Sequence, residues 1–281
     1  MPVAAWRRSA TERIRAAIRK GFSMSLLRQF FRRRKPEGPA TPRDTDRDWQ
    51  IIGASEPYYG VLSHDRFRRE NLDPQAIDEF YQSGVGDIDH AWQRMAQLGR
   101  FAPRSALDFG CGVGRLSIPL AQRLEHVVGV DISPGMIEQA RLRAPENLEF
   151  SSFIPADRTV DWVISLIVFQ HIPPSQGLAQ LRKLLGCLSQ DGGVTLQFMF
   201  ARSEALGNSV GGRVVLGPDG ATAIAGRLSA ARVPEGTMLM HDYDMSVVLA
   251  ELHGAGINRL AIEFCDHGGH VGATLYGLRN P

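Results

Sequence analysis

The 281-residue chain has no hydrophobic run of 18 residues or more, the length that a helix needs to cross a bilayer. Its N-terminal region also has no continuous apolar stretch of the kind that marks a secretory signal. Cysteine is scarce, because Cys111, Cys187 and Cys265 are the only three, far apart and without metal-ligand spacing. Separated thiols in odd number argue against a disulfide framework and indicate a reducing compartment. We therefore expect a cytoplasmic protein, with a membrane-peripheral location as the alternative.

That alternative comes from the N-terminus, where acidic residues are nearly absent. Residues 1–36 hold 11 Lys or Arg and one acid, Glu12, whereas the rest of the chain has 21 bases against 29 acids. Three interpretations stay open: a disordered basic tail, an amphipathic helix on an anionic membrane surface or partner, and an organellar targeting segment. Because the positive charge is confined to this tail, nucleic acid is not an expected partner of the body.

Composition divides the chain into three parts. Residues 36–48 are dominated by proline and charge and predict a linker, so the basic tail and linker together span 1–48. Residues 49–100 predict a helical cap. Within it we expect one helix to begin at Asp73-Pro74, an N-cap acid followed by proline, and a second helix to follow Asp87.

Residues 101–281 alternate short apolar runs with amphipathic ones, which predicts an α/β domain with a parallel sheet. A turn is expected at Asp191-Gly192-Gly193, and residues 201–240 interrupt the alternation with a long insertion loop that we expect to cover a site. Two more strands close the domain. The predicted strands are 105–109, 126–130, 148–151, 161–169, 194–200, 257–264 and about 271–278.

The most informative stretch is Asp108-Phe109-Gly110-Cys111-Gly112-Val113-Gly114, between the first strand and a helix expected over about 113–124. Such a turn lets a ligand reach bare backbone beside the free N–H groups of a helix start. Its spacing is G-x-G-x-G, whereas the dinucleotide fingerprint G-x-G-x-x-G requires glycine where Arg115 stands. The carboxylate of Asp108 would repel a pyrophosphate but suits a ligand with a cationic amino group.

A second acid, Asp131, ends the second predicted strand. A carboxylate at this position can accept hydrogen bonds from both hydroxyls of a ribose. The alternative is an N-cap for the helix that Ser133-Pro134 begins.

These residues resemble the first motif and the ribose-binding acid of the class I S-adenosylmethionine-dependent methyltransferases. The resemblance covers residues 101–281. It implies a Rossmann-like sheet of seven mostly parallel strands, the last antiparallel, with helices on both faces, and S-adenosyl-L-methionine as the cofactor. It also implies that the methionine end of the cofactor lies among Asp108, Gly110, Gly112 and Gly114, and that Asp131 holds the ribose.

The same resemblance gives candidates for the rest of the cofactor. Ile132 and Met136 would flank the adenine, although either can equally be a core residue. The Gly-Asp pair that the family usually carries after the third strand is missing here, so Ser152 or the backbone near Phe153 is the candidate for the adenine edge. Leu166, on the fourth strand, completes the cofactor-binding set.

His171 follows the fourth predicted strand, at the carboxyl edge where an open α/β sheet binds its ligand. It is either a general base for the acceptor or a structural histidine bonded to a loop carbonyl. His241-Asp242-Tyr243 can line an acceptor pocket, but we favour a cap and solvated turn there. His267 and His270 have no obvious third ligand, so no metal site is predicted.

We therefore expect methyl transfer to an oxygen or nitrogen of a small-molecule or carbohydrate-type acceptor. An RNA or protein methyltransferase with the tail as anchor is the alternative, and a non-catalytic cofactor-binding regulator is another. The strand that ends near His171 lacks the Asn/Asp-Pro-Pro-Tyr/Phe stretch usual in amino-methylating nucleic-acid enzymes of the family. The glycine spacing disfavours an NAD dehydrogenase. The sequence gives no indication of oligomeric state.

Overall fold

The computed structural model describes residues 45–203, 213–217, 220–224 and 234–279, with side chains described for the first and last of these ranges. The elements below belong to one compact unit, Arg43–Pro281. The predictions for the basic tail and for most of the loop at 201–240 fall outside the described residues. No helix within the described ranges is long and apolar enough to cross a membrane.

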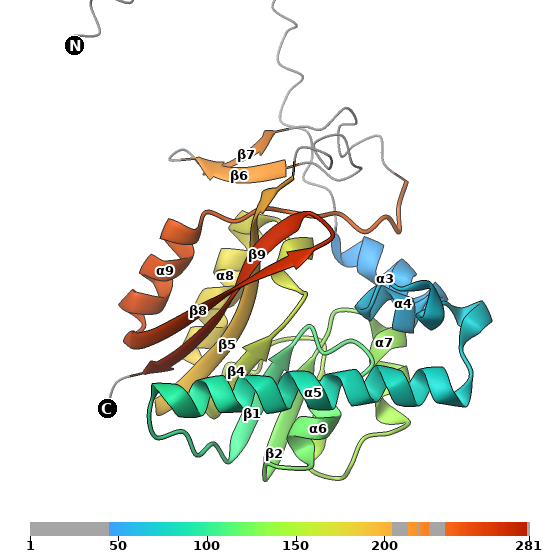
Figure 1. Cartoon of the computed structure of the whole chain (residues 1–281), viewed down its shortest axis with the longest axis horizontal. Helices are drawn as coiled ribbons and strands as arrows, with labels where there is room; N and C mark the ends of the chain where they lie inside the picture. Colours follow the sequence, from blue (N-terminus) through green and yellow to red (C-terminus); the bar gives the residue numbers. More distant parts are fainter. Residues whose placement is uncertain (1–44, 204–212, 218–219, 225–233, 280–281) are drawn as a thin grey trace, which may run out of the picture. The chain divides into compact units, whose positions relative to one another are not determined.

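Seven strands form one sheet in the order β3-β2-β1-β4-β5-β9-β8 (Figure 1). The first five are parallel, and β9 pairs antiparallel with both β5 and β8. This confirms the predicted seven-stranded, mostly parallel α/β fold. The strands are β1 Ser105–Phe109, β2 His126–Val130, β3 Leu148–Ser151, β4 Val160–Ser165, β5 Leu188–Arg202, β8 Ile257–His267 and β9 His270–Arg279. A separate antiparallel pair consists of β6 Arg213–Gly217 and β7 Gly220–Ile224.

Helices cover both faces of the sheet, because successive strand side chains point to opposite faces and both sets are apolar. On one face, Leu107 and Val163 share a core with α8 (Pro174–Gly186) and α9 (Met245–Gly254). On the other face, Trp162 packs with α5 (Pro74–Leu98) and α6 (Ser117–Ala121). Figure 1 shows α5 in front of the sheet and α8 behind it.

One continuous helix of 25 residues, α5, replaces the two helices predicted over residues 73–98. Its N-cap is Asp73, as predicted, and the Asp73 side chain accepts a hydrogen bond from the Ala76 amide at 2.7 Å. Gly84 lies inside this helix, at a close contact that leaves no room for a side chain. A Cβ at this position would lie 2.0 Å from the carbonyl oxygen of Arg115, just after the glycine turn. Gly86 has nothing within 4 Å of the corresponding position.

Two predicted boundaries around the fourth and fifth strands are wrong. The strand β4 ends at Ser165 instead of Phe169, because the chain turns at Ile167, whose φ is 63°, and then forms the short 3-10 helix η3 (Phe169–His171). The expected turn at 191–193 lies inside β5. There the register shifts, since Leu188 pairs with Val160 while Gly193 already pairs with Trp162.

Helix bounds also differ at two places close to the predicted site. The helix after the glycine turn, α6, is limited to Ser117–Ala121, because residues 112–116 form consecutive turns. Another helix, α3 (Thr45–Ser55), begins inside the segment whose composition predicts a linker. A third helix, α7, spans Pro134–Arg141, where Ser133-Pro134 predicts its start.

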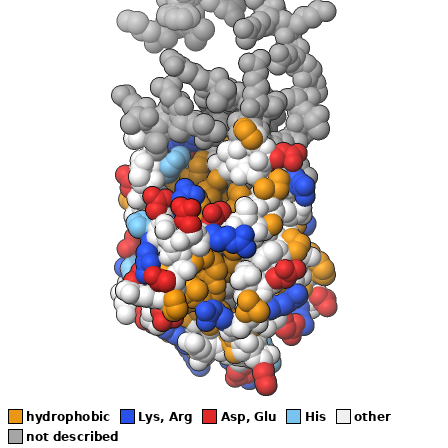
Figure 2. Space-filling view, turned by 90° about the vertical axis from the view of Figure 1, so that its right-hand side faces the viewer, with side chains coloured by type: hydrophobic (Ala, Val, Ile, Leu, Met, Phe, Trp, Pro, Cys, Tyr) orange, Lys and Arg blue, Asp and Glu red, His pale blue; other side chains and the backbone are white. Residues whose placement is uncertain are grey.

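The segment before α5 packs on the carboxyl edge of the sheet. It consists of α3, α4 (Pro57–Val61) and the 3-10 turns η1 (Asp65–Phe67) and η2 (Arg69–Asn71). Ile52 and Tyr58 from this segment form a small core with Val113 of the glycine turn and Met136 of α7. Figure 2 turns this side toward the viewer, and hydrophobic side chains gather down its middle with charged ones around them.

The paired glycines of α5 give a stability test. Gly84→Ala places a methyl group against the Arg115 carbonyl, so we expect the free energy of unfolding to fall by about 1–3 kcal/mol. Gly86→Ala, two residues away in open space, is the matched control and should raise it by about 0.5–1 kcal/mol. Urea unfolding of both variants checks the signs. Equal changes would contradict the close contact at Gly84.

Candidate cofactor and acceptor site

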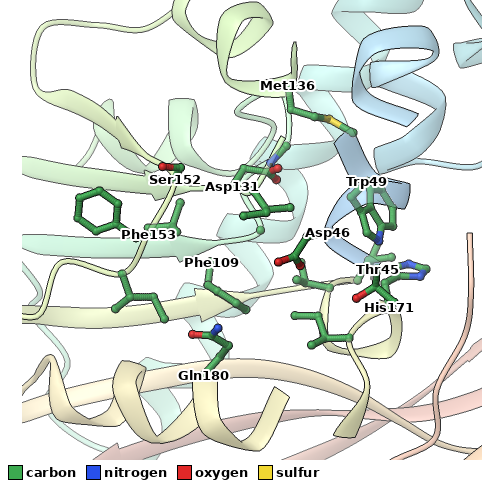
Figure 3. A pocket seen from close by; sticks show the side chains of 18 of the residues that line it. Thr45, Asp46, Trp49, Phe109, Asp131, Met136, Ser152, Phe153, His171 and Gln180 are labelled. Carbon is green, nitrogen blue, oxygen red and sulfur yellow. Dashed lines mark hydrogen bonds between the residues drawn. The ribbon is translucent and has the colours of Figure 1, made fainter. Parts of the chain in front are cut away.

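A cavity of about 490 Å³ lies at the carboxyl edge of the sheet. The ends of β1 and β2 form part of its wall, together with residues that follow β3 and β4 and residues of α3, α4 and α8. In Figure 3, Asp131 and Met136 lie on one side of the cavity, and Trp49, Thr45 and His171 lie together on the other. The edge of the sheet is thus the site that the sequence predicts.

The glycine turn has the left-handed backbone that its residues predict. Gly110, Gly112 and Gly114 have φ values of 74°, 53° and 84°. The first two line the cavity, whereas Gly114 lies behind it, and a Cβ there would contact side chains of Ile118 and Ala140.

Three amides of this turn are hydrogen-bonded within the protein. Gly110 and Cys111 donate to the carbonyl of Val130 at 2.7 and 3.0 Å, and Gly112 donates to the Asp131 carboxylate. The helix α6 begins only at Ser117. The turn therefore offers a close backbone surface to a ligand, and the three amides fix the turn onto the end of β2.

Asp131 lines the cavity with a carboxylate that is held on both oxygens. Oδ2 accepts from the Gly112 amide and Oδ1 from the Ser133 amide, each at 2.8 Å. Burial raises the pKa of this carboxyl group. The N-cap of α7 is Ser133, whose side chain accepts from the Met136 amide. The N-cap alternative for Asp131 is therefore wrong, and a fixed carboxylate remains for a ligand.

Asp108 lies behind the glycine turn and is not among the residues that line the cavity. Its side chain is buried and accepts a hydrogen bond from the Ser117 hydroxyl at 2.5 Å. Burial raises its pKa to about 6, in opposition to the Ser117 bond and the Arg115 charge. Arg115 itself points to α5, where Nη1 lies 2.6 Å from Asp87. A contact between Asp108 and a ligand amino group stays a prediction.

The other predicted cofactor residues all reach the cavity. Ile132, Met136, Ser152 and Leu166 line it, and Phe153 beside them is 70% exposed. Residues of α3 and α4 also line the cavity, although the sequence did not predict it. Composition assigned Thr45 and Asp46 to a linker, and no local signal placed Trp49 beside His171.

His171 is bonded to a loop carbonyl, as the structural interpretation expects, and it also lines the cavity, while its role as a base stays a prediction. Nδ1 lies 2.8 Å from the carbonyl oxygen of Leu239 and must donate to it, since a carbonyl only accepts. The proton is therefore on Nδ1, and Nε2 keeps its lone pair. The ring lines the cavity at 4.8 Å from the Trp49 ring, centroid to centroid. Burial lowers the pKa of His171 to about 4, so the ring is neutral at physiological pH.

The turn expected at 241–243 is buried instead of solvated. Asp242 forms an ion pair with Arg202 at 3.2 Å, with side chains that are 2% and 6% exposed. The Tyr243 hydroxyl donates to the carbonyl of Ile172, and the N-cap of α9 is Asp244. None of the three residues lines the cavity. Within the described ranges, no three His, Cys, Asp or Glu side chains are arranged to hold a metal ion.

Comparison with known proteins identifies the domain that carries this site. Residues 106–192, which hold the glycine turn, Asp131 and His171, match the family model described as a methyltransferase domain. Residues 106–192 thus form a methyltransferase domain, and the sheet around them has the Rossmann-like fold of class I methyltransferases. This methyltransferase domain includes β1–β4 and the helices between them.

Two curated relatives and one solved structure are similar to the chain. It is 32% identical over 154 residues to trans-aconitate 2-methyltransferase of Methylobacterium radiotolerans, covering 51% of this chain and 58% of that protein. It is 33% identical over 129 residues to a 23S rRNA (uracil(1939)-C(5))-methyltransferase of Marinomonas posidonica, covering 43% and 28%. The chain thus spans less than two thirds of either relative. Magnesium protoporphyrin IX methyltransferase from Synechocystis PCC 6803 with bound SAH has a TM-score of 0.52 at 19% identity, over 84% of this chain and 100% of that chain, which shows the shared fold.

The burial of the His171 ring predicts that the ring takes up a proton only at low pH. The unfolded ring takes a proton near pH 6.5, whereas the folded ring does so only near pH 4, so lowering the pH through this window favours unfolding. We expect the wild type to lose up to about 3 kcal/mol of stability relative to His171→Gln between pH 7 and pH 4. Ring ¹⁵N NMR should show the Nδ1–H tautomer and no titration above pH 5. A ring that titrates above pH 6 would contradict this assignment.

Proposed function

We propose that this protein transfers the methyl group of S-adenosylmethionine to an oxygen or nitrogen of a small-molecule acceptor, with carbohydrate-type acceptors included. One observation carries the proposal: the anchored carboxylate of Asp131 and the neutral imidazole of His171 line a single cavity. The Asp131 carboxylate can bind a hydroxyl of the cofactor, and the His171 imidazole can accept a proton.

The residues of the cavity fit the cofactor chemically. S-adenosylmethionine supplies an electrophilic methyl group on a positively charged sulfur. Asp131 offers two fixed oxygens to the ribose hydroxyls, and Ile132 and Met136 offer apolar contacts to the adenine. Burial raises the pKa of both Asp108 and Asp131, and a cationic ligand lowers the cost of burying such carboxylates.

The chain's own contribution to transfer is positioning and proton removal. With its proton fixed on Nδ1 by the Leu239 carbonyl, His171 presents Nε2 as the acceptor for a hydroxyl or ammonium proton. The Trp49 ring packs against His171 and closes that side of the cavity, so it restricts water there. Holding the acceptor in line with the methyl group supplies the rest of the rate.

The size of the cavity favours a small acceptor. A volume of about 490 Å³ is within the range of sites that enclose one drug-sized ligand. The cofactor takes most of that room, and Thr45, Asp46 and Trp49 of α3 form part of the wall around it. The names of trans-aconitate 2-methyltransferase and magnesium protoporphyrin IX methyltransferase are consistent with a small acceptor.

RNA methylation is the second candidate, and one observation favours it. The segment 1–36 carries 11 bases and one acid, and one relative is named a 23S rRNA methyltransferase. Removal of residues 1–36 separates the candidates. A steep loss of salt-sensitive RNA binding supports the RNA enzyme, whereas unchanged transfer to a small acceptor removes it.

Cofactor binding is tested first by calorimetry with S-adenosylhomocysteine. Asp131→Ala should weaken binding by about tenfold to a hundredfold, since hydrogen bonds to a charged group are lost. Asp161→Asn is the matched control, because that carboxylate also accepts backbone amides, from Arg104 and Ser105, but at the opposite edge of the sheet. It should leave the affinity unchanged. No binding by the wild type, or full binding by Asp131→Ala, would refute the cofactor site.

The role of His171 needs the acceptor, which labelled cofactor can reveal in fractions of a lysate. Once an acceptor is in hand, His171→Ala should lower kcat by about a hundredfold or more, within the usual range for general-base catalysis. His126→Ala, an exposed histidine at the start of β2, controls for loss of an imidazole. If kcat falls by less than about tenfold, positioning carries the rate and His171 is not the base.

A further inference from the structure

The turn after β4 holds a strained residue at the wall of the cavity. Ile167 has a φ of 63°, and among the described residues it is the single non-glycine with positive φ. For a β-branched side chain this conformation is unfavourable, and it persists only where the surroundings impose it. Leu166, Ile167 and Val168 all line the cavity.

A buried glutamine of the neighbouring strand holds this turn. Gln197 of β5 is 6% exposed, and its Oε1 accepts a hydrogen bond from the Ile167 amide at 2.9 Å. Its Nε2 faces three acceptors on β8 and β9: Cys265 Sγ at 3.3 Å, His267 Nε2 at 3.2 Å and Thr274 Oγ1 at 3.5 Å. The amide therefore has a fixed orientation, with its oxygen toward Ile167.

The conformation of Ile167 sets the position of Val168, and Val168 contacts both halves of the site. On one side it packs on the glycine turn, where a Cβ on Gly110 would lie 2.4 Å from Val168 Cγ2. On the other side its carbonyl accepts from the His171 amide at 2.9 Å. Gln197 is not among the lining residues of the cavity.

We propose that Gln197 is a positioning residue for methyl transfer. By holding Ile167 in the left-handed conformation, it fixes Val168 between Gly110 of the cofactor wall and His171 of the acceptor side. This inference rests on the proposed function. Without the Gln197 oxygen, the Ile167 amide loses its partner and the strained backbone relaxes, so the cavity wall shifts although no lining residue has changed.

The test combines three variants and calorimetry with S-adenosylhomocysteine. Gln197→Leu removes the bond to Ile167. Thr195→Val is the matched control on the same strand, since it removes a buried hydrogen bond from the Trp162 indole that lies away from the cavity. Ile167→Gly removes the strain, because glycine adopts the left-handed conformation at little cost.

We expect Gln197→Leu to bind S-adenosylhomocysteine about tenfold more weakly than Thr195→Val, even where the two variants unfold at similar temperatures. In the Ile167→Gly background, the added loss from Gln197→Leu should fall to threefold or less. The proposal is overturned if Gln197→Leu loses less than threefold relative to Thr195→Val, or if its loss persists in that background. A wild type that does not bind the ligand refutes the proposed function instead.

Amide hydrogen exchange gives a second measurement that needs no variant. In the wild-type protein the Ile167 amide is bonded to a buried side-chain oxygen, so its exchange should be at least a hundredfold slower than in an unstructured peptide. Exchange at the unprotected rate overturns the proposal even if Gln197→Leu fails to fold.

Discussion

Close backbone contact at the glycine turn is the constraint on which the rest of this structure depends. Three segments far apart in sequence meet residues 110–115 where side chains leave no room: Val168 at Gly110, Val61 at Gly112, and Gly84 of α5 at the Arg115 carbonyl. The carbonyl of Val130 and the carboxylate of Asp131 then take the amides of the turn. The cap, the sheet and α5 are thereby placed relative to one another by one short stretch of backbone.

The carboxylates around the glycine turn favour a cationic ligand. Asp108 is buried, the nearby charge of Asp131 raises its pKa, and both carboxylates raise the pKa of the Cys111 thiol. The guanidinium of Arg115 compensates only in part, because its closest carboxylate is Asp87 on α5. Such an excess of buried negative charge is expensive in the protein alone and favourable beside a cation. A sulfonium ligand with an ammonium group meets this condition, whereas a pyrophosphate does not.

The strands of the domain and the position of its site could be predicted from the sequence, because apolar runs and glycine spacing are local signals. The bounds of β1, β2 and β3 agree with expectation, and the site lies at the predicted edge.

Errors arose where tertiary contacts override a local rule. Two helices were expected over residues 73–98, but α5 is continuous, and Gly84 inside it has no side chain because the Arg115 backbone lies against it. Apolar residues 166–169 continued the pattern of a strand, yet the Gln197 bond turns the chain at Ile167, and no local signal reveals a partner 30 residues away. Contacts between the cap and the sheet, such as Trp49 with His171, were equally out of reach.

The end of the long loop is bonded to α3, whose residues line the cavity. The Gly236 amide donates to Asp48 of α3 at 2.8 Å, so the end of the long loop is bonded to the helix that carries Thr45 and Trp49. A few residues further on, the Leu239 carbonyl fixes the tautomer of His171. The segment that orients the proposed base is therefore the one that holds α3 over the cavity. Because the Leu239 carbonyl sets the tautomer of the proposed base, a substitution that displaces residues 236–239 should also disturb His171.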